Sequence, residues 1–220
     1  MVNEALSSNS LDSTRKSWEM FIGDKRHHFV AEHGTRFGIK GKNASIIVSL
    51  RDKLIEFSKS HVTNAKLQQL LVLLQDDAVF DELVCLAAVW SICLEPLWSK
   101  LRCANVVDSI ELLKSFVQLA DDAQNLDPRA MITDPTKNRA IRSIRGLGAI
   151  ETKVFDLLAT HEPRDALAFD CLLRKMLESA AAYVRCLQKN WDVEHIPSCL
   201  LKIKFSNQVI CVIFCYIFYL

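Results

Sequence analysis

Residues 76–94 read DDAVFDELVCLAAVWSICL, and this stretch decides the fold that we expect for the chain. Its larger apolar side chains recur every three or four residues, a spacing that places them on one face of a helix. They are Phe80, Leu83, Val84, Ala87, Trp90 and Leu94. Asp76 and Asp77 precede the run and can cap it, because a carboxylate accepts hydrogen bonds from the free N–H groups of a first turn. We predict the core helix of the fold over 79–94.

Pro96 follows this core helix closely. A proline has no backbone N–H and its ring crowds the preceding turn, so the helix is expected to kink or stop near Cys93. Helical spacing then resumes with Leu97, Trp98 and Leu101.

Helical patterns also occupy most of the remaining chain. Asp12 and Ser13 can cap a first helix, and Gly23 is a point at which that helix can divide. Its apolar face holds Trp18, Phe21, Ile22, Phe29 and Val30. Further helices are predicted over 43–59, 64–75, 107–123, 150–160 and 164–191, whereas the glycine-rich stretch 34–42 is expected to be a loop. We therefore predict an all-α fold, an irregular multi-helix bundle of about seven to eight helices with an apolar C-terminal tail.

The distribution of polar and apolar stretches suggests a domain organisation. Residues 1–12 are small and polar and are expected to be disordered. An N-terminal helical subdomain is predicted over 13–124 and a C-terminal one over 139–195, joined by a linker at 125–138 that contains two Asp-Pro steps. Residues 196–220 form the apolar tail.

Charge and cysteine usage narrow the classes of function. The chain has 27 basic and 26 acidic residues, a net charge of +1, so no global field attracts nucleic acid or anionic lipid. Its 8 cysteines form no CxxC pair and are interpreted as buried structural thiols. With a polar first stretch that lacks the apolar core of a signal peptide, we expect an intracellular protein, cytoplasmic or nuclear.

A local basic segment near the start of the chain is a candidate nucleic-acid contact, because basic side chains interleaved with aromatic ones can bind phosphates and bases. The basic residues are Arg15, Lys16, Lys25, Arg26, Arg36, Lys40 and Lys42. Acidic neighbours, Glu19, Asp24 and Glu32, dilute the segment, and such charge runs are most often solvated faces.

Catalytic and metal-binding patterns are not evident. His27, His28 and His33 lack the spacing of a coordination set, so no metal site is predicted. No Ser, Cys or Thr has the context of a nucleophile, and the paired carboxylates are interpreted as helix caps and exposed charges. We predict no catalytic residue and no cofactor.

The tail allows three interpretations. Residues 209–220 are an apolar run, whereas a helix that crosses the hydrocarbon core needs about 20 residues. The run is a short tail anchor, an aberrant C-terminus read through from non-coding sequence, or a buried terminal element. The candidate membrane residues are Val209, Ile210, Val212, Ile213, Phe214, Tyr216, Ile217, Phe218 and Leu220.

Part of the chain resembles a loosely defined group of uncharacterised animal proteins associated with mobile elements. The resemblance covers about residues 25–119 and is carried by the strings RHH, HGTRFGI, NAS and LEPLW. It implies a helical, transposon-derived protein, encoded by a host genome or by the element, whose biochemistry is unknown. The acidic triad of a transposase nuclease cannot be assigned in this sequence.

These observations lead to one main hypothesis and two rivals. The main hypothesis is a non-enzymatic helical interaction module that binds a protein partner or a second copy of itself. The rivals are a nucleic-acid-binding accessory protein that uses the basic segment, and a tail-anchored membrane protein.

Overall fold

A computed structural model describes residues 12–23, 29, 37–138 and 149–189 of the chain. All regular structure in these ranges is helical, which confirms the all-α prediction. The elements are α2 (Asp12–Ile22), α3 (Phe37–Ser49), α4 (Arg51–Ser60), α5 (Ala65–Gln75), α6 (Asp77–Ala88), the π-helix η1 (Val89–Leu94), α7 (Glu95–Leu101), α8 (Val106–Asn125), α9 (Pro128–Thr133), α10 (Ala149–Thr160) and α11 (Ala166–Lys189). The predictions for residues 1–11 and 196–220 lie outside the described residues.

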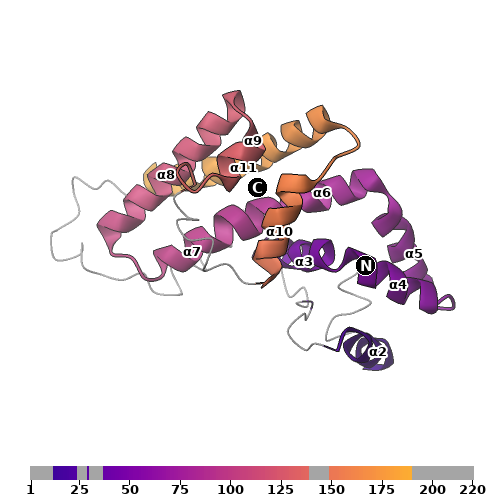
Figure 1. Ribbon diagram of the computed structural model, residues 1–220. Coiled ribbons are helices and arrows are strands. Elements are labelled where there is room, and N and C mark those ends of the chain that lie inside the picture. Colours follow the sequence, from indigo (N-terminus) through magenta and orange to yellow (C-terminus); the bar gives the residue numbers. More distant parts are fainter. Residues whose placement is uncertain (1–11, 24–28, 30–36, 139–148, 190–220) are drawn as a thin grey trace.

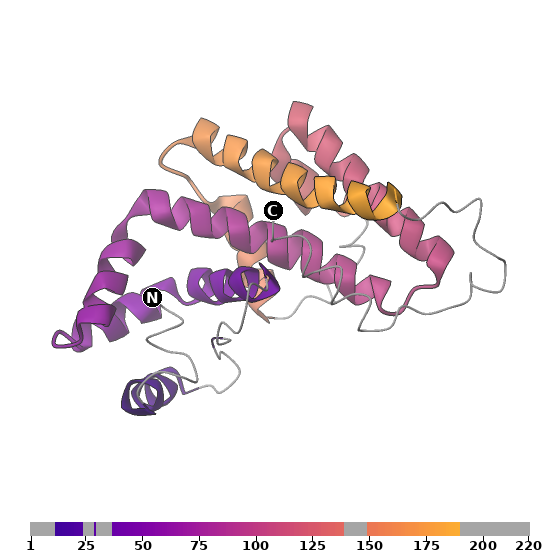
Figure 2. The ribbon, with the colours of Figure 1, turned by 180° about the vertical axis from the view of Figure 1, so that it is seen from behind.

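The predicted core helix is the central element of the structure. Helix α6, η1 and α7 form one continuous run through the molecule, with α8 and α11 along one side and α3 along the other (Figures 1 and 2). Asp76 caps α6 as predicted, because its side chain accepts a hydrogen bond from the Ala78 N–H at 2.9 Å. Asn64 and Asn105 cap α5 and α8 in the same way.

The predicted loop at 34–42 is wrong for its second half, because α3 already begins at Phe37. Glycine weakens a helix, but it also permits close approach of another backbone or side chain. A Cβ atom on Gly41 would lie 2.5 Å from Cγ of Trp90, so this glycine lets α3 pack directly against η1. In the same interface, Ser45 Oγ lies 2.6 Å from Ser91 Oγ and donates to the Gly41 carbonyl at 2.8 Å.

The expected kink or stop near Cys93 is also corrected. The chain continues as a π-helix from Val89 to Leu94 and passes directly into α7. In an α-helix the carbonyl of Ile92 would accept from the N–H at position 96, which proline lacks. The side chain of Asn138 donates to this carbonyl at 3.2 Å and to the Ile132 carbonyl at 3.0 Å. The buried side-chain amide of Asn138, far away in sequence, thus supplies the Ile92 carbonyl with a donor that Pro96 cannot supply.

The stretch predicted as a linker, 125–138, contains a packed helix. Asp127 caps α9 through the Arg129 N–H, and Pro128 occupies the first turn, where its missing N–H has no consequence. Met131 and Ile132 of α9 are buried among residues from both sides of this stretch. The two Asp-Pro steps therefore lie at the start of a helix and in a turn, and they do not separate two hydrophobic cores.

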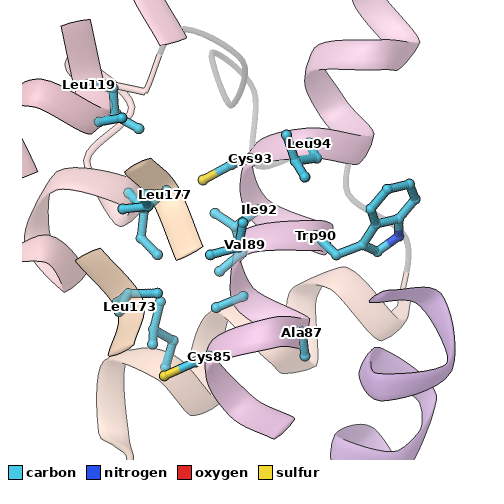
Figure 3. Close-up of a cluster of buried hydrophobic side chains, with 14 of the residues drawn as sticks. Cys85, Ala87, Val89, Trp90, Ile92, Cys93, Leu94, Leu119, Leu173 and Leu177 are labelled. Carbon is cyan, nitrogen blue, oxygen red and sulfur yellow. The ribbon is translucent and has the colours of Figure 1, made fainter. Parts of the chain in front are cut away.

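The buried side chains form two clusters. The larger one, here the main cluster, is built around α6, η1, α8, α10 and α11, and Figure 3 shows its centre, where Cys85, Ile92, Cys93, Leu173 and Leu177 meet. The smaller one, here the α2–α5 cluster, joins α2, α3, α4 and α5. Leu83 and Ile150 pack against both clusters.

The four cysteines whose side chains the structure describes divide into two kinds. Cys85 and Cys93 are buried as predicted, and burial raises the pKa of each thiol to about 12, assisted at Cys85 by the carboxylate of Asp81. Cys103 and Cys171 are exposed, which corrects the expectation that these thiols lie in the core.

Candidate interaction site on helix α2

The residues of the predicted basic segment are not brought together by the described part of the chain. Lys16 is exposed on α2, while Lys40 and Lys42 are exposed on α3. Arg15 lies in α2, and Lys25, Arg26 and Arg36 fall outside the described residues. Lys42 lies close to Glu95, whose carboxyl pKa is raised by burial and by Glu151 and is partly lowered again by Lys42. The described members of the segment are thus divided between α2 and α3, and Lys42 has an acidic neighbour.

An aromatic cluster instead joins α2 to the body of the protein. Its hub is Phe57 of α4, which is 1% exposed. The Trp18 ring meets Phe57 edge-on with centroids 5.2 Å apart, and the Phe21 ring lies 5.4 Å from Phe57. The His61 ring lies 4.2 Å from that of Phe57. Centroid separations of this size are typical of favourable aromatic pairs.

The cluster reaches the surface at Phe21, and we define the apolar edge as Phe21 together with Met20 and Val62, the exposed apolar residues next to Phe21 and His61 in the chain. Met20 is 76% exposed, Val62 is 71% exposed and Phe21 is 39% exposed. Val62 directly follows His61 in the chain, and Met20 directly precedes Phe21. Single exposed apolar residues are ordinary, but a group that continues a buried aromatic cluster is characteristic of an interaction site.

A second group of side chains, between α6, α9 and the start of α11, has the composition of a catalytic site. His161 Nε2 lies 2.5 Å from Asp81 Oδ1, and both side chains are mostly buried. The second oxygen of Asp81 accepts from the Arg164 N–H at 3.1 Å. Both carboxylate oxygens are therefore used to hold the turn between α10 and α11 against α6.

Arg129 completes this polar group. Its guanidinium donates to Asp170 at 3.1 Å and to the His161 carbonyl at 3.0 Å, and it lies 4.3 Å from the centre of the Phe169 ring. The neighbouring Cys85 Sγ is directed to the Phe169 carbonyl at 3.7 Å, and its raised pKa leaves almost no thiolate near neutral pH. These groups bind one another, so the arrangement is best explained as a structural connection between helices.

Two shallow hollows lie along α8. One, of about 410 Å³, extends from Lys100 and Cys103 to Ser115, and the other, of about 520 Å³, extends from Glu111 to Lys137. Both are open and lined by charges of both signs, unlike the enclosed apolar pockets that hold small ligands.

No group of three or more possible metal ligands occurs among the described side chains. No helix in the described ranges is long and apolar enough to cross a membrane, and the candidate membrane residues 209–220 lie outside those ranges.

Comparison with known proteins finds no match, whether to a family model, a curated protein or a solved structure. The site therefore has to be judged from its own geometry. Sequence reasoning placed Trp18, Phe21 and Ile22 on one helix face, and this was the available signal for the aromatic cluster. It did not identify Phe57 as the hub or Val62 as part of the edge, because the contacts that join them to α2 are distant in sequence.

Proposed function

We propose that this chain is a non-enzymatic helical module that binds a protein partner through the apolar edge of α2 and the α4–α5 turn. The observation that carries the proposal is the contact between the buried ring of Phe57 and the partly exposed ring of Phe21, beside which Met20, its neighbour in the chain, is exposed; Val62, which follows His61, is exposed as well. Interface cores favour aromatic residues and methionine and contain few charges. Origin from a mobile element, which the resemblance of residues 25–119 implies, is part of this proposal.

The distribution of ionisable groups also favours binding over catalysis. Asp81 and His161 form an acid–base pair whose partners lie within the protein. One carboxylate oxygen of Asp81 contacts His161, and the other accepts from the Arg164 N–H. A general acid or base instead needs an open position within hydrogen-bond reach of a substrate.

The test uses a photo-crosslinking amino acid at position 20 of the full-length chain. A crosslinked protein is identified and purified, and its affinity is then measured for wild type and for the double variant Met20→Asp/Val62→Asp. We expect the double variant to lose at least about tenfold in affinity, because each new carboxylate would be desolvated in the interface. The matched control is Leu126→Asp, at the end of α8, where the native side chain is 52% exposed.

Two results would count against this proposal. One is an affinity that the double variant leaves unchanged. The other is adduct formation with nucleic acid in place of protein, together with duplex binding that weakens steeply with added salt and depends on Lys16 and Lys40, because that dependence marks phosphate contacts.

A further inference from the structure

Helix α2 packs against the rest of the protein in the way that a peptide helix binds in a groove. Its three anchors, Trp18, Phe21 and Ile22, are spaced at i, i+3 and i+4, which is the pattern by which an amphipathic helix binds in an apolar groove. Trp18 is 3% exposed and Ile22 is 9% exposed. The receiving surface is the remainder of the α2–α5 cluster, with Phe57 at the contact with Trp18 and Phe21.

Among the described residues, α2 packs against few other elements, and the buried ring of Phe29, between α2 and α3, lies 6.3 Å from that of Trp18. The helix ends at Gly23, whose φ of 68° stops helical geometry, and α3 does not begin until Phe37. Its main packing partner is α4, and it lies at the margin of the molecule in both Figure 1 and Figure 2. By contrast, α3 packs against α6, η1 and α10.

The docked helix is held less tightly than its ring contacts alone would suggest. The indole N–H of Trp18 is buried, and no acceptor for it is found among the described residues. A buried donor without a partner lowers the stability of the state that buries it by about 1–3 kcal/mol. A helix with the same anchors and a satisfied polar group would therefore bind this surface better than α2 does.

We infer that the α4–α5 surface around Phe57 is a receptor for an amphipathic helix, and that α2 is its intramolecular occupant. The partner is a helix with a Trp or Phe anchor followed by apolar residues three and four positions later. It binds when α2 leaves, so α2 inhibits binding in the resting chain. This inference rests on the proposed function in that the chain binds a protein partner at this end of the molecule; here the partner helix replaces α2, whereas in the proposed function the partner contacts the exposed side chains of docked α2.

The test measures binding of a fluorescent peptide of residues 12–22, DSTRKSWEMFI, to full-length chains by anisotropy. Wild type should bind weakly, because the apparent affinity falls in proportion to the fraction of molecules whose site is open. Trp18→Ala in the full-length chain removes the main anchor of the competitor, so the peptide should bind this variant at least about tenfold more tightly. A peptide with alanine at both aromatic positions, 18 and 21, is the negative control and should bind neither chain.

A second measurement covers the case in which Trp18→Ala does not fold. Hydrogen exchange of the wild-type chain with excess peptide should accelerate at the amides of α2 while those of α6 and α11 stay protected. Phe21→Ala, at a side chain that is already 39% exposed, serves as a milder opening variant.

Equal peptide affinity for wild type and a folded Trp18→Ala chain would overturn the inference, as would the absence of binding to both. The proposed function has a separate readout, the crosslink from position 20. A protein partner whose affinity depends on Met20 and Val62, without any release of α2, would support the proposed function and refute the receptor. Release of α2 by the peptide without any protein adduct would support the receptor and count against the proposed function.

Discussion

Gly41 of α3 and Trp90 of η1 are in such close contact that a Cβ atom on the glycine would lie 2.5 Å from Cγ and 2.6 Å from Cβ of the indole side chain. Real carbon contacts are longer, so a methyl group at position 41 would push the two helices apart. A glycine inside a helix is usually a weakness. At position 41 it is required by the packing of α3 against η1.

Gly41→Ala is therefore expected to destabilise the protein by about 1–3 kcal/mol, the usual effect of overpacking, although Gly-to-Ala changes in helices generally stabilise. The free energy of unfolding from denaturant titration measures this effect. Lys40→Ala, at an exposed position of the same helix, is the control and should change stability by less than about 0.5 kcal/mol. Trp90→Ala, which removes the indole atoms that would lie 2.5 and 2.8 Å from this methyl group and keeps Cβ, should reduce the penalty of Gly41→Ala, and an unchanged penalty would contradict the contact.

The amide of Asn138 is expected to be coupled to Pro96. Asn138→Ala removes the donor to the carbonyls of Ile92 and Ile132, which should cost about 1–3 kcal/mol of stability. Pro96→Ala restores an N–H at position 96 that can bond to Ile92. In that background the cost of Asn138→Ala should be smaller, as measured in a double-mutant cycle. Strict additivity of the two changes would show that the amide does not compensate for the proline.

The carboxyl of Glu95 should make stability depend on pH. Burial, with a further contribution from Glu151, raises its pKa above the ordinary value of 4.5. The folded state therefore disfavours the ionised form, and stability falls as pH rises from about 4.5 through the folded pKa. Glu95→Gln should be more stable than wild type at pH 7, and this advantage should vanish near pH 4, where both states of wild type are protonated.

Thermal unfolding of both proteins across this pH range measures the difference. Glu162→Gln, an equal charge change at an exposed position, should not show the same pH-dependent gain. A Glu95→Gln variant that is less stable than wild type at pH 7 would mean that attraction by Lys42 exceeds the effect of burial.

Thiol labelling should separate the cysteines by position. In the native protein at neutral pH, Cys103 and Cys171 are expected to react with maleimide, whereas Cys85 and Cys93 are protected by burial and by thiol pKa values of about 12. Mass spectrometry of the digested protein identifies the labelled sites, and unfolding in guanidinium should make all four reactive. Native labelling of Cys93 at the rate of Cys171 would disprove the packing of η1.

Asp81 is expected to hold the turn between α10 and α11. Asp81→Ala removes the contacts to His161 and to the Arg164 N–H and should destabilise the protein by about 2 kcal/mol. It should also accelerate hydrogen exchange at the Arg164 amide. Glu82→Ala, at the adjacent exposed carboxylate, is the control. If both variants protect this amide equally, Asp81 does not hold the turn.

Local patterns were sufficient to predict most helices. The start of α5 after Asn64, the start of α6 after Asp76 and the whole of α10 follow from caps and from three- and four-residue spacing. These signals lie within a few residues of the structure that they predict. The end of α2 at Gly23 is also a local signal, because the positive φ of this one residue ends the helix.

The errors arose where a distant residue decides the local structure. The local sequence places Gly41 in a loop, and only the contact with Trp90, from another helix, explains why a glycine is needed there. Pro96 predicts a break until Asn138 provides the missing donor. The candidate site was hidden for the same reason, since Phe57 acquires its role only through contact with α2. The basic residues are grouped in the sequence, and the described ones lie on two different helices, α2 and α3, so a nucleic-acid contact there stays a prediction.

The division of the core into two clusters has a consequence for how the protein opens. Cooperative units of unfolding follow contiguous packing, and among the described residues Leu83 and Ile150 are the partly buried side chains that pack against both clusters. Helices α2, α4 and α5 should therefore exchange their amide protons through partial opening events, at a free energy below that of global unfolding. Helix α3 contributes side chains to both clusters and should be protected with the larger unit. The chain would then spend a small fraction of its time with one end melted and the other intact.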